Sequence, residues 1–210
     1  AGLPPATREV DGVVEMMLDA TQNFDQPLTA ARLFDWHAAL FPTGRSGMTK
    51  ITVGGWRNDE TGPMQVVSGP IGRERVHYEA PVTAQLDTEM EAFLAWFDDA
   101  SSLDPVIKAA IAHIWFVTIH PFDDGNGRIG RLLITLYLCA KGSLRAPLLY
   151  LSLFLKTNRA EYYRLLQGVR ETGDWEAWLA FYLTGVEQTA NQAFDAATRI
   201  VALFKADRDL

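Results

Sequence analysis

Twelve consecutive residues, from His120 to Arg131, combine side chains that suit the binding of nucleotide phosphates. The stretch holds one histidine, two adjacent aspartates, the turn Gly125-Asn126-Gly127 and two arginines. Glycines permit positive φ angles and a close approach of the backbone, and successive N–H groups at a helix start bind anions. The residue types and their spacing therefore predict a phosphate-binding loop.

Each charged or titratable side chain of this stretch has a chemical role that fits such a loop. Arg128 and Arg131 are three positions apart, so they share one face of a helix and can clamp further phosphates. Asp124 offers a hard oxygen ligand, and one carboxylate with phosphate oxygens and water commonly holds Mg²⁺. His120 can take up a proton near neutral pH. Each residue alone would be an ordinary surface or helix-end residue, but the combination favours a site.

Two apolar segments with a helical pattern flank this stretch and must position it. Val106 to Ile119 precedes it and Ile129 to Ala140 follows it, so the glycines fall where a loop becomes a helix. Asp104 and Pro105 are preferred N-cap and first-turn residues for the earlier helix. We therefore expect residues 120–131 to form an active-site loop and the start of a helix.

Most of the remaining chain also carries helix signals. Thr7 and Thr29 are candidate N-caps, and the long segment after Asp174 carries aromatic residues along one stripe. The further helices are expected at about residues 7–23, 29–41, 83–100, 147–155, 159–170 and 174–205.

The segment 51–81 is the exception, because its clustered glycines and prolines exclude a helix. Met64 to Val67 and Arg75 to Tyr78 have strand character, and Gly69 to Gly72 between them favours a turn. The sequence thus predicts an all-α fold, with one helical domain over residues 1–210 and a single β-hairpin flap.

The composition excludes several classes of protein. The chain has 210 residues, and 19 basic against 26 acidic side chains give a net charge of −7. This balance provides no general basic field for nucleic acid or anionic lipid. The single cysteine, Cys139, excludes an intrachain disulfide, and the apolar runs fall short of the roughly 20 residues of a membrane span. No secretion signal is evident at the start, and we expect a soluble cytoplasmic protein.

The stretch from His120 to Arg131 resembles the signature of the Fic family, His-Pro-Phe-x-Asp/Glu-Gly-Asn-Gly-Arg-x-x-Arg, at every specified position. Further similarity lies in Trp36 to Pro42, in the Met64 to Pro81 hairpin and in Arg159 to Tyr163. Together these segments resemble a bacterial Fic subgroup that usually carries an extra N-terminal region. The resemblance implies a Fic-type helical domain that transfers AMP from ATP to a Ser, Thr or Tyr hydroxyl of a target protein.

The resemblance also implies a role for each residue of the motif. His120 would be the general base for the target hydroxyl, and Asp124 would be the ligand of Mg²⁺. The anion hole for the α and β phosphates would comprise Gly125, Asn126 and Gly127, the β and γ phosphates would contact Arg128 and Arg131, and Tyr163 with Tyr162 would close over the adenine. Glycine at position 127 favours AMP transfer, because the related Doc-type kinases have lysine there and bind ATP in the reverse orientation.

The hairpin would serve as a flap that aligns the target segment beside His120. Its docking strand would include Val76, His77 and Tyr78, whose side chains alternate in direction along the strand. Strand addition supplies affinity through main-chain hydrogen bonds, so it makes little demand on the sequence of the target. A purely structural hairpin without substrate contact is the alternative.

The resemblance also bears on regulation and assembly. Many Fic proteins carry an inhibitory helix with the pattern Ser/Thr-x-x-x-Glu-Gly/Asn, and its nearest counterpart, Thr7 to Gly12, has Asp in place of Glu and suits an ordinary capped helix. The inhibitory segment would therefore lie upstream of this chain or belong to a separate antitoxin. The resemblance also allows a homodimer.

Two other functions compete with AMP transfer. One is an enzyme that removes AMP or uses another phosphate-containing donor, which the motif residues do not separate from AMP transfer. The other is a non-catalytic Fic-fold interaction module, against which the intact His120, Asp124 and both arginines argue. The remaining histidines receive no catalytic role: His37 and His113 are expected to be packed, and His77 to lie on a surface strand.

Overall fold

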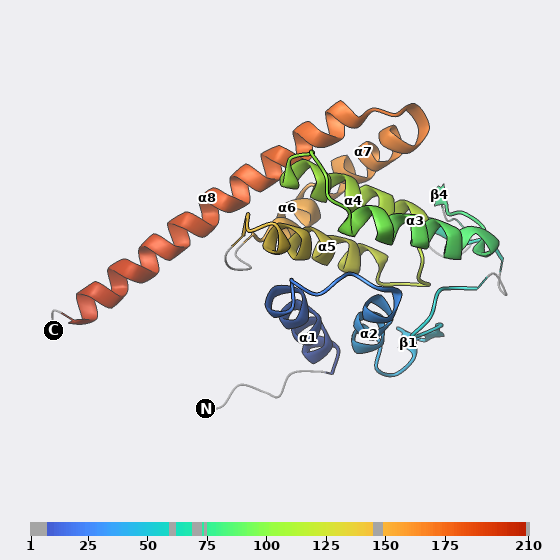
Figure 1. The fold of residues 1–210 in the computed structure, drawn as a ribbon, viewed down its shortest axis with the longest axis horizontal. Helices are drawn as coiled ribbons and strands as arrows, with labels where there is room; N and C mark the ends of the chain where they lie inside the picture. The colour runs from blue at the N-terminus through green and yellow to red at the C-terminus, as the bar shows by residue number, and fades with distance from the viewer. Residues whose placement is uncertain (1–7, 59–61, 69–72, 74, 145–148, 209–210) are drawn as a thin grey trace. The chain divides into compact units, whose positions relative to one another are not determined.

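The computed structural model (Figure 1) describes residues 8–58, 62–68, 73, 75–144 and 149–208. The chain consists of two compact units. The first unit comprises residues 1–143 and the second comprises residues 144–210. Regular structure in both units is mainly α-helical, which confirms the fold class expected from the sequence. Within the described residues, no helix is both long enough and apolar enough to cross a membrane.

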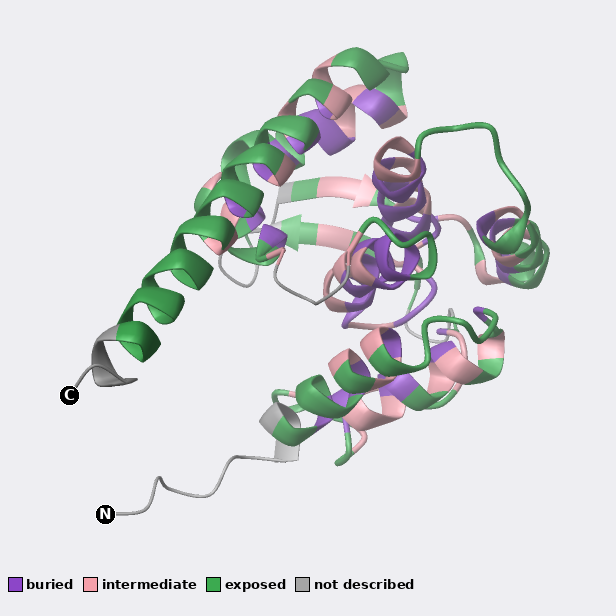
Figure 2. Cartoon of the chain, turned by 60° about the vertical axis from the view of Figure 1, so that its left-hand side comes forward, coloured by how far each residue is buried: buried purple, intermediate pink, exposed green. Residues whose placement is uncertain are grey.

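The described part of the first unit contains five α-helices. They are α1 (Arg8–Gln22), α2 (Ala30–Leu40), α3 (Leu86–Asp98), α4 (Pro105–Ile119) and α5 (Asn126–Ala140), with a 3-10 turn, η1 (Thr83–Gln85), before α3. α4 packs against α5, α3 packs on α4, and α1 packs on both α2 and α5. Most residues of α4 and α5 are buried, and Figure 2 shows buried residues gathered in the central helices of this unit.

The α4–α5 pair holds the motif, because α4 ends at Ile119, one residue before His120, and α5 begins at Asn126.

Two of the three predicted N-caps lie within the described residues, and both form the expected hydrogen bond. The Asp104 carboxylate accepts a hydrogen bond from Val106 N at 2.8 Å, and the Thr29 hydroxyl accepts one from Arg32 N at 3.1 Å. Thr7, the third predicted cap, lies outside the described residues.

Gly12 has a packing function at the contact between α1 and α2. A Cβ atom at this position would lie 1.9 Å from the carbonyl oxygen of Ala39 in α2, so only glycine fits. The glycine of the segment from Thr7 to Gly12 is thus explained by the close approach of two helices, in agreement with the interpretation of this segment as an ordinary helix.

The predicted flap is an antiparallel hairpin of β3 (Gln65–Ser68) and β4 (Arg75–Glu79). Its expected turn at residues 69–72 lies outside the described residues. A second, smaller antiparallel pair, β1 (Arg45–Ser46) with β2 (Thr49–Lys50), was not expected from the sequence. Strands of two residues are too short to show a period-two pattern, which explains why the sequence did not reveal them.

The flap contains an irregularity that corrects the expected alternation of its side chains. Val66 pairs with Tyr78, whereas Val67 pairs with Val76, so His77 is an extra residue in β4. Neighbouring residues Val66 and Val67 face opposite sides of the hairpin, and directly paired residues share a side. Val76 and Tyr78 therefore lie on opposite sides, not on the same side as regular alternation predicts, because the bulge inserts one residue between them.

Three helices form the described part of the second unit. They are α6 (Leu151–Thr157), α7 (Arg159–Thr172) and α8 (Trp175–Arg208). α6 and α7 each pack against α8, and the ring of Tyr162 in α7 lies 6.1 Å from that of Trp178 in α8. Gly185 of α8 permits a close contact with α6, since a Cβ atom there would lie 2.5 Å from Phe154 Cδ1.

Candidate active site

His120 ends α4 in a left-handed conformation, with φ 52° and ψ 58°. Among the described residues other than glycine, it alone has a positive φ. Such a conformation costs about 1–3 kcal/mol and is typical of functional sites. The Nδ1 atom of its ring lies 3.1 Å from the carbonyl oxygen of Val117. A neutral imidazole that donates from Nδ1 accepts protons at Nε2, so this contact selects the tautomer that a general base needs.

The glycine turn leads into the N-terminus of α5. Gly125 is the N-cap residue with φ 85°, and no described side chain caps this helix. The first helical bond runs from Ile129 N to Gly125 O at 3.0 Å, so the N–H groups of Asn126, Gly127 and Arg128 precede it. The helix dipole and these N–H groups together favour an anion at this end of α5.

The side chain of Asn126 stabilises the loop itself. Its Oδ1 accepts a hydrogen bond from Phe122 N at 3.0 Å, and its Nδ2 donates one to Phe122 O at 2.7 Å. Because the residue is buried, this pair of bonds commits the whole amide group to the loop. Asn126 can therefore take part in an anion hole through its main-chain N–H group.

Asp124 is held by hydrogen bonds to both carboxylate oxygens. Oδ1 accepts from Gly125 N at 2.6 Å, and Oδ2 accepts from the hydroxyl of Ser46 in β1, also at 2.6 Å. No described group of three or more His, Cys, Asp or Glu side chains could hold a metal ion by itself. A single partly exposed carboxylate does fit a Mg²⁺ ion whose other ligands are phosphate oxygens and water.

Both arginines of the motif lie over the first turn of α5, as their spacing predicts. The guanidinium carbon of Arg128 is 4.7 Å from the ring centroid of Phe41, and its Nη2 is 3.7 Å from Asp124 Oδ2. Arg131 reaches back toward the glycine turn, since a Cβ atom at Gly127 would lie 3.2 Å from Arg131 Nη1. The Arg131 guanidinium therefore lies beside Gly127, and that of Arg128 lies near Asp124.

Buried aromatic rings pack against the motif. Phe122 is fully buried, and the ring of His37 in α2 stacks on it at a centroid distance of 4.2 Å. His37 Nε2 also lies 3.1 Å from the carbonyl oxygen of Asp124. Burial lowers the pKa of His37, although the hydrogen bond to Asp124 and the charges of the two motif aspartates partly oppose this effect. His37 is thus a packed residue, as expected, that also holds the loop.

The flap is attached to the end of α4 close to His120. The Tyr78 hydroxyl donates a hydrogen bond to the carbonyl oxygen of Thr118 at 2.7 Å. Tyr78 is therefore an anchor of the flap, whereas Val76 on the other side of the hairpin is half exposed together with its partner Val67. The predicted docking strand thus has one attached side and one accessible apolar side.

Tyr162 and Tyr163, the residues expected near adenine, lie in α7 of the second unit. Their rings are 5.3 Å apart, but Tyr162 is buried whereas Tyr163 is 37% exposed. The guanidinium of Arg159 lies 5.4 Å from the centroid of the Tyr163 ring. Tyr163 is thus the more accessible of the two rings.

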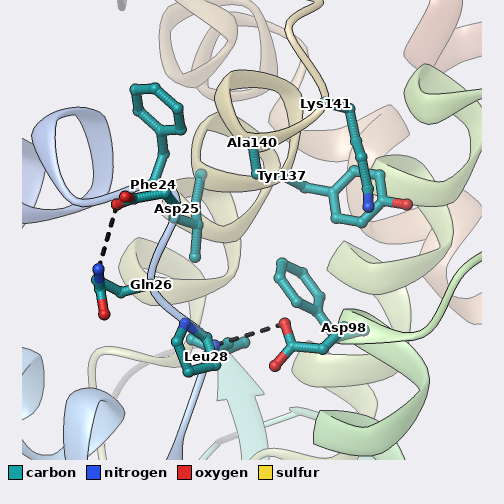
Figure 3. Close-up of a pocket in the computed structure, with 11 residues that line it drawn as sticks. Phe24, Asp25, Gln26, Leu28, Asp98, Tyr137, Ala140 and Lys141 are labelled. Carbon is teal, nitrogen blue, oxygen red and sulfur yellow. Dashed lines mark hydrogen bonds between the residues drawn. The ribbon is translucent and has the colours of Figure 1, made fainter.

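Two cavities of the first unit lie away from the motif. One, of about 330 Å³, lies at the C-terminal ends of α3 and α5 and is lined by Asp98, Tyr137 and Lys141 among others (Figure 3). The other, of about 520 Å³, lies between α1 and α2 beside Asp19 and Trp36.

Three residues that touch the motif were not identified as functional from the sequence. Ser46 binds Asp124, Thr52 N donates to Asp123 Oδ2 at 2.7 Å, and Arg57 binds the main chain of His120. All three lie between α2 and the flap. The sequence around them gave no signal of this role, because their partners in the motif lie 63 to 78 positions away.

Comparison with known proteins identifies relatives of the chain. A sequence model described as Fic/DOC family matches residues 27–138, just over half of the chain. The protein adenylyltransferase fic-1 of Caenorhabditis elegans is 38% identical over 95 residues, 44% of this chain and 17% of that protein. The protein adenylyltransferase Fic of Drosophila willistoni is 34% identical over 129 residues, 59% of this chain and 24% of that protein. The chain thus spans about a quarter or less of the length of these relatives.

Solved structures share the fold. A Fic family protein from Desulfovibrio desulfuricans G20 superimposes with a TM-score of 0.72 and 24% identity, covering 93% of this chain and 56% of that chain. A Fic domain-containing signaling protein from Bacteroides thetaiotaomicron VPI-5482 gives a TM-score of 0.67 and 21% identity, covering 94% of this chain and 76% of that chain.

Proposed function

Because the chain belongs to the Fic/DOC family, we propose that it transfers AMP from ATP to a hydroxyl group of a target protein. The observation that carries this proposal is the intact motif between α4 and α5, with His120 at the end of α4 and with Asp124, the glycine turn and both arginines at the start of α5. Relatives named protein adenylyltransferase support the same reaction.

In the proposed reaction, the hydroxyl oxygen of a target Ser, Thr or Tyr attacks the α-phosphorus of ATP. The bond between this phosphorus and the oxygen that bridges to the β-phosphorus breaks, and pyrophosphate leaves. His120 Nε2 accepts the hydroxyl proton as the new P–O bond forms. The contact of His120 Nδ1 with Val117 supports this role, because it favours the tautomer with a basic Nε2.

The start of α5 would hold the phosphates. The N–H groups of Asn126, Gly127 and Arg128 would bind the α and β phosphates, and the guanidinium groups of Arg128 and Arg131 would bind β and γ. Asp124 would hold Mg²⁺, and the ion would neutralise charge that develops on the pyrophosphate.

The remaining parts of the proposal concern the adenine, the target and the domain. Tyr163, with Tyr162 behind it, would close over the adenine, and the flap would align a target strand through main-chain hydrogen bonds. The bulge at His77 bears on the second role, because it leaves Val76 on the accessible side while Tyr78 anchors the flap. Residues 1–210 would act as one Fic domain, restrained by an upstream segment or a separate antitoxin.

ATP labelled at the α or the γ phosphate tests the reaction. The chain is incubated with each label, alone and with a cell lysate, and proteins are separated under denaturing conditions. AMP transfer predicts label on protein from the α position alone. Label from the γ position would identify a kinase, and protein labelled by neither nucleotide would favour an enzyme with another donor or a non-catalytic module.

Substitution of the base gives the matched comparison. His120→Ala should reduce labelling by about 10²- to 10⁴-fold, the usual contribution of general base catalysis, with little change in ATP affinity. Asp123→Asn is the control, because the amide oxygen of asparagine can still accept the hydrogen bond from Thr52 N. If His120→Ala weakened ATP binding as much as it slowed labelling, His120 would bind phosphate and would not act as the base.

A further inference from the structure

Arg57 connects two segments that the proposed reaction must bring together. Its main-chain N donates to the carbonyl oxygen of Pro121 at 2.9 Å, and its Nε donates to the carbonyl oxygen of His120 at 2.8 Å. Its Nη2 donates to the carbonyl oxygen of Pro81. One buried side chain, 3% exposed, thus binds both the catalytic loop and the end of the flap.

The hydrogen bond between Arg57 and Pro81 joins the two ends of the flap segment. Arg57 precedes the flap strands and Pro81 lies two residues after the end of β4, so the guanidinium links the two ends of the segment that carries β3 and β4. A second main-chain bond, from Ala80 N to Met64 O at 2.9 Å, closes the hairpin at the same end. The base of the flap is therefore fixed to the same arginine that holds the loop.

The contact with His120 acts on the direction of its ring. His120 has a left-handed backbone, and φ and ψ set the direction in which its Cα–Cβ bond points. Charge-assisted hydrogen bonds from a guanidinium are short and directional, so the bond to His120 O favours this backbone conformation. Arg57 thus contacts His120 through the main chain of that residue.

We propose that Arg57 is a positioning residue that couples the flap to His120, so that the strand docked on the flap and the base that deprotonates it keep a fixed relation. The proposal rests on the proposed function for the identity of the base and of the docked strand. It goes beyond the motif, because Arg57 lies 63 positions before His120 in the sequence.

Arg57→Lys tests the coupling, because lysine keeps the charge but replaces a planar group with several donors by one ammonium group. Arg32→Lys is the matched control. Arg32 also donates to main-chain carbonyl oxygens, those of Gln26, Asp19 and Asn23, but it does so between α1 and α2. Both substitutions replace a guanidinium that donates to main-chain carbonyl oxygens. Arg32 in addition binds the Asp19 carboxylate at 2.7 Å, and only Arg57 contacts the loop and the flap.

Hydrogen–deuterium exchange measures the coupling without any need for activity. In Arg57→Lys, amides of the flap strands and amides of residues 118–124 should both exchange about tenfold faster or more, while α4 residues 108–116 exchange as in the unsubstituted chain. In Arg32→Lys, neither the flap nor the loop should change relative to α4. An unchanged flap, an unchanged loop, or acceleration of only one of them in Arg57→Lys would overturn the proposal.

Kinetics provide the second measurement. Arg57→Lys should lower kcat for protein labelling by about 10- to 100-fold, as expected for a misplaced base, and change the KM for ATP less than about twofold. A loss confined to KM would contradict a positioning role. If the unsubstituted chain transferred no AMP, the proposed function would fail, whereas the exchange experiment would still decide the role of Arg57. Should Arg57→Lys not fold, Arg57→Gln takes its place, since its neutral amide can still donate to one carbonyl oxygen.

Discussion

Asp124 keeps its orientation through a hydrogen bond within the motif and a second one to Ser46, which is 78 positions away. The second bond places the β1–β2 hairpin next to the carboxylate that would bind Mg²⁺. Groups that hold a metal ligand by hydrogen bonds tune both its direction and its affinity for the ion. At the scale of single residues, Ser46 is therefore the contact outside the motif that acts most directly on Asp124.

Ser46→Ala should raise the Mg²⁺ concentration that gives half-maximal labelling, by about tenfold, the lower end of the range for such supporting groups. The lost hydroxyl leaves Asp124 Oδ2 without its donor in the hairpin, so the carboxylate can rotate. Met48→Ala is the control, because Met48 lies at the tip of the same hairpin and is 94% exposed. Identical Mg²⁺ titrations for the two variants would contradict the role of Ser46.

The residues of the motif could be predicted from the sequence because they are contiguous and each has a distinctive chemistry. Ser46 and Arg57 could not, since their importance depends on contacts across long sequence separations. For Asn126, the sequence predicted the position in the motif but not the contacts of the side chain. Its place in the motif was evident, but its bonds to Phe122 depend on the loop conformation.

At the scale of elements, the α4–α5 contact sets the distance between His120 and the glycine turn. Gly130 of α5 lies at this contact, where a Cβ atom would meet Val117 Cγ1 at 2.9 Å and His113 Nδ1 at 3.3 Å. The helices can approach closely because this residue has no side chain. A methyl group would force α4 and α5 apart or displace both neighbours.

Gly130→Ala should lower the free energy of unfolding by about 1–3 kcal/mol, the usual range for overpacking a core. Gly168→Ala, in α7, is the matched helical control, because a Cβ atom there would meet only Asp174 Cβ at 3.8 Å. Alanine at an unobstructed helix position should stabilise the protein by up to about 1 kcal/mol. Urea denaturation of both variants measures the two effects, and equal signs would refute this account of the α4–α5 contact.

The helices could be predicted from local sequence signals, whereas the β1–β2 hairpin and the bulge in β4 could not. Asp104 with Pro105 and Thr29 fixed two helix starts correctly, because caps act within one turn. The strands of the β1–β2 hairpin have only two residues each, and the bulge at His77 depends on how β4 pairs with β3. Neither leaves a periodic pattern that the sequence could show.

At the scale of the molecule, His37 links the stability of the first unit to pH. Its Nε2 donates to Asp124 O, and its Nδ1 has no partner among the described residues. Protonation of Nδ1 would therefore bury a charged donor without an acceptor, in agreement with the lowered pKa that burial causes. The unfolded chain takes up this proton first as the pH falls, so acid favours unfolding.

The free energy of unfolding should thus fall as the pH drops below about 6.5, the ordinary histidine pKa, toward the lowered pKa of His37, by at most about 1.4 kcal/mol per pH unit for one proton. His37→Gln should reduce this pH dependence. Phe122→Leu disturbs the same ring stack without removing a titratable group, so it should lower stability equally at pH values on either side of the transition. Denaturation curves across this pH range provide the test, and an unaltered slope in His37→Gln would exclude His37 as its source.

The hydrogen bonds of the Asn126 side chain also affect how the protein ages. An asparagine followed by glycine is prone to lose ammonia, because the unobstructed glycine nitrogen can attack the side-chain amide carbon. Here both polar atoms of that amide are bound to Phe122, and the residue begins a helix. Ring closure requires this turn to open, so deamidation at Asn126 should proceed only through local opening. The fraction of deamidated Asn126 in a stored sample would then record how often the loop between α4 and α5 has opened.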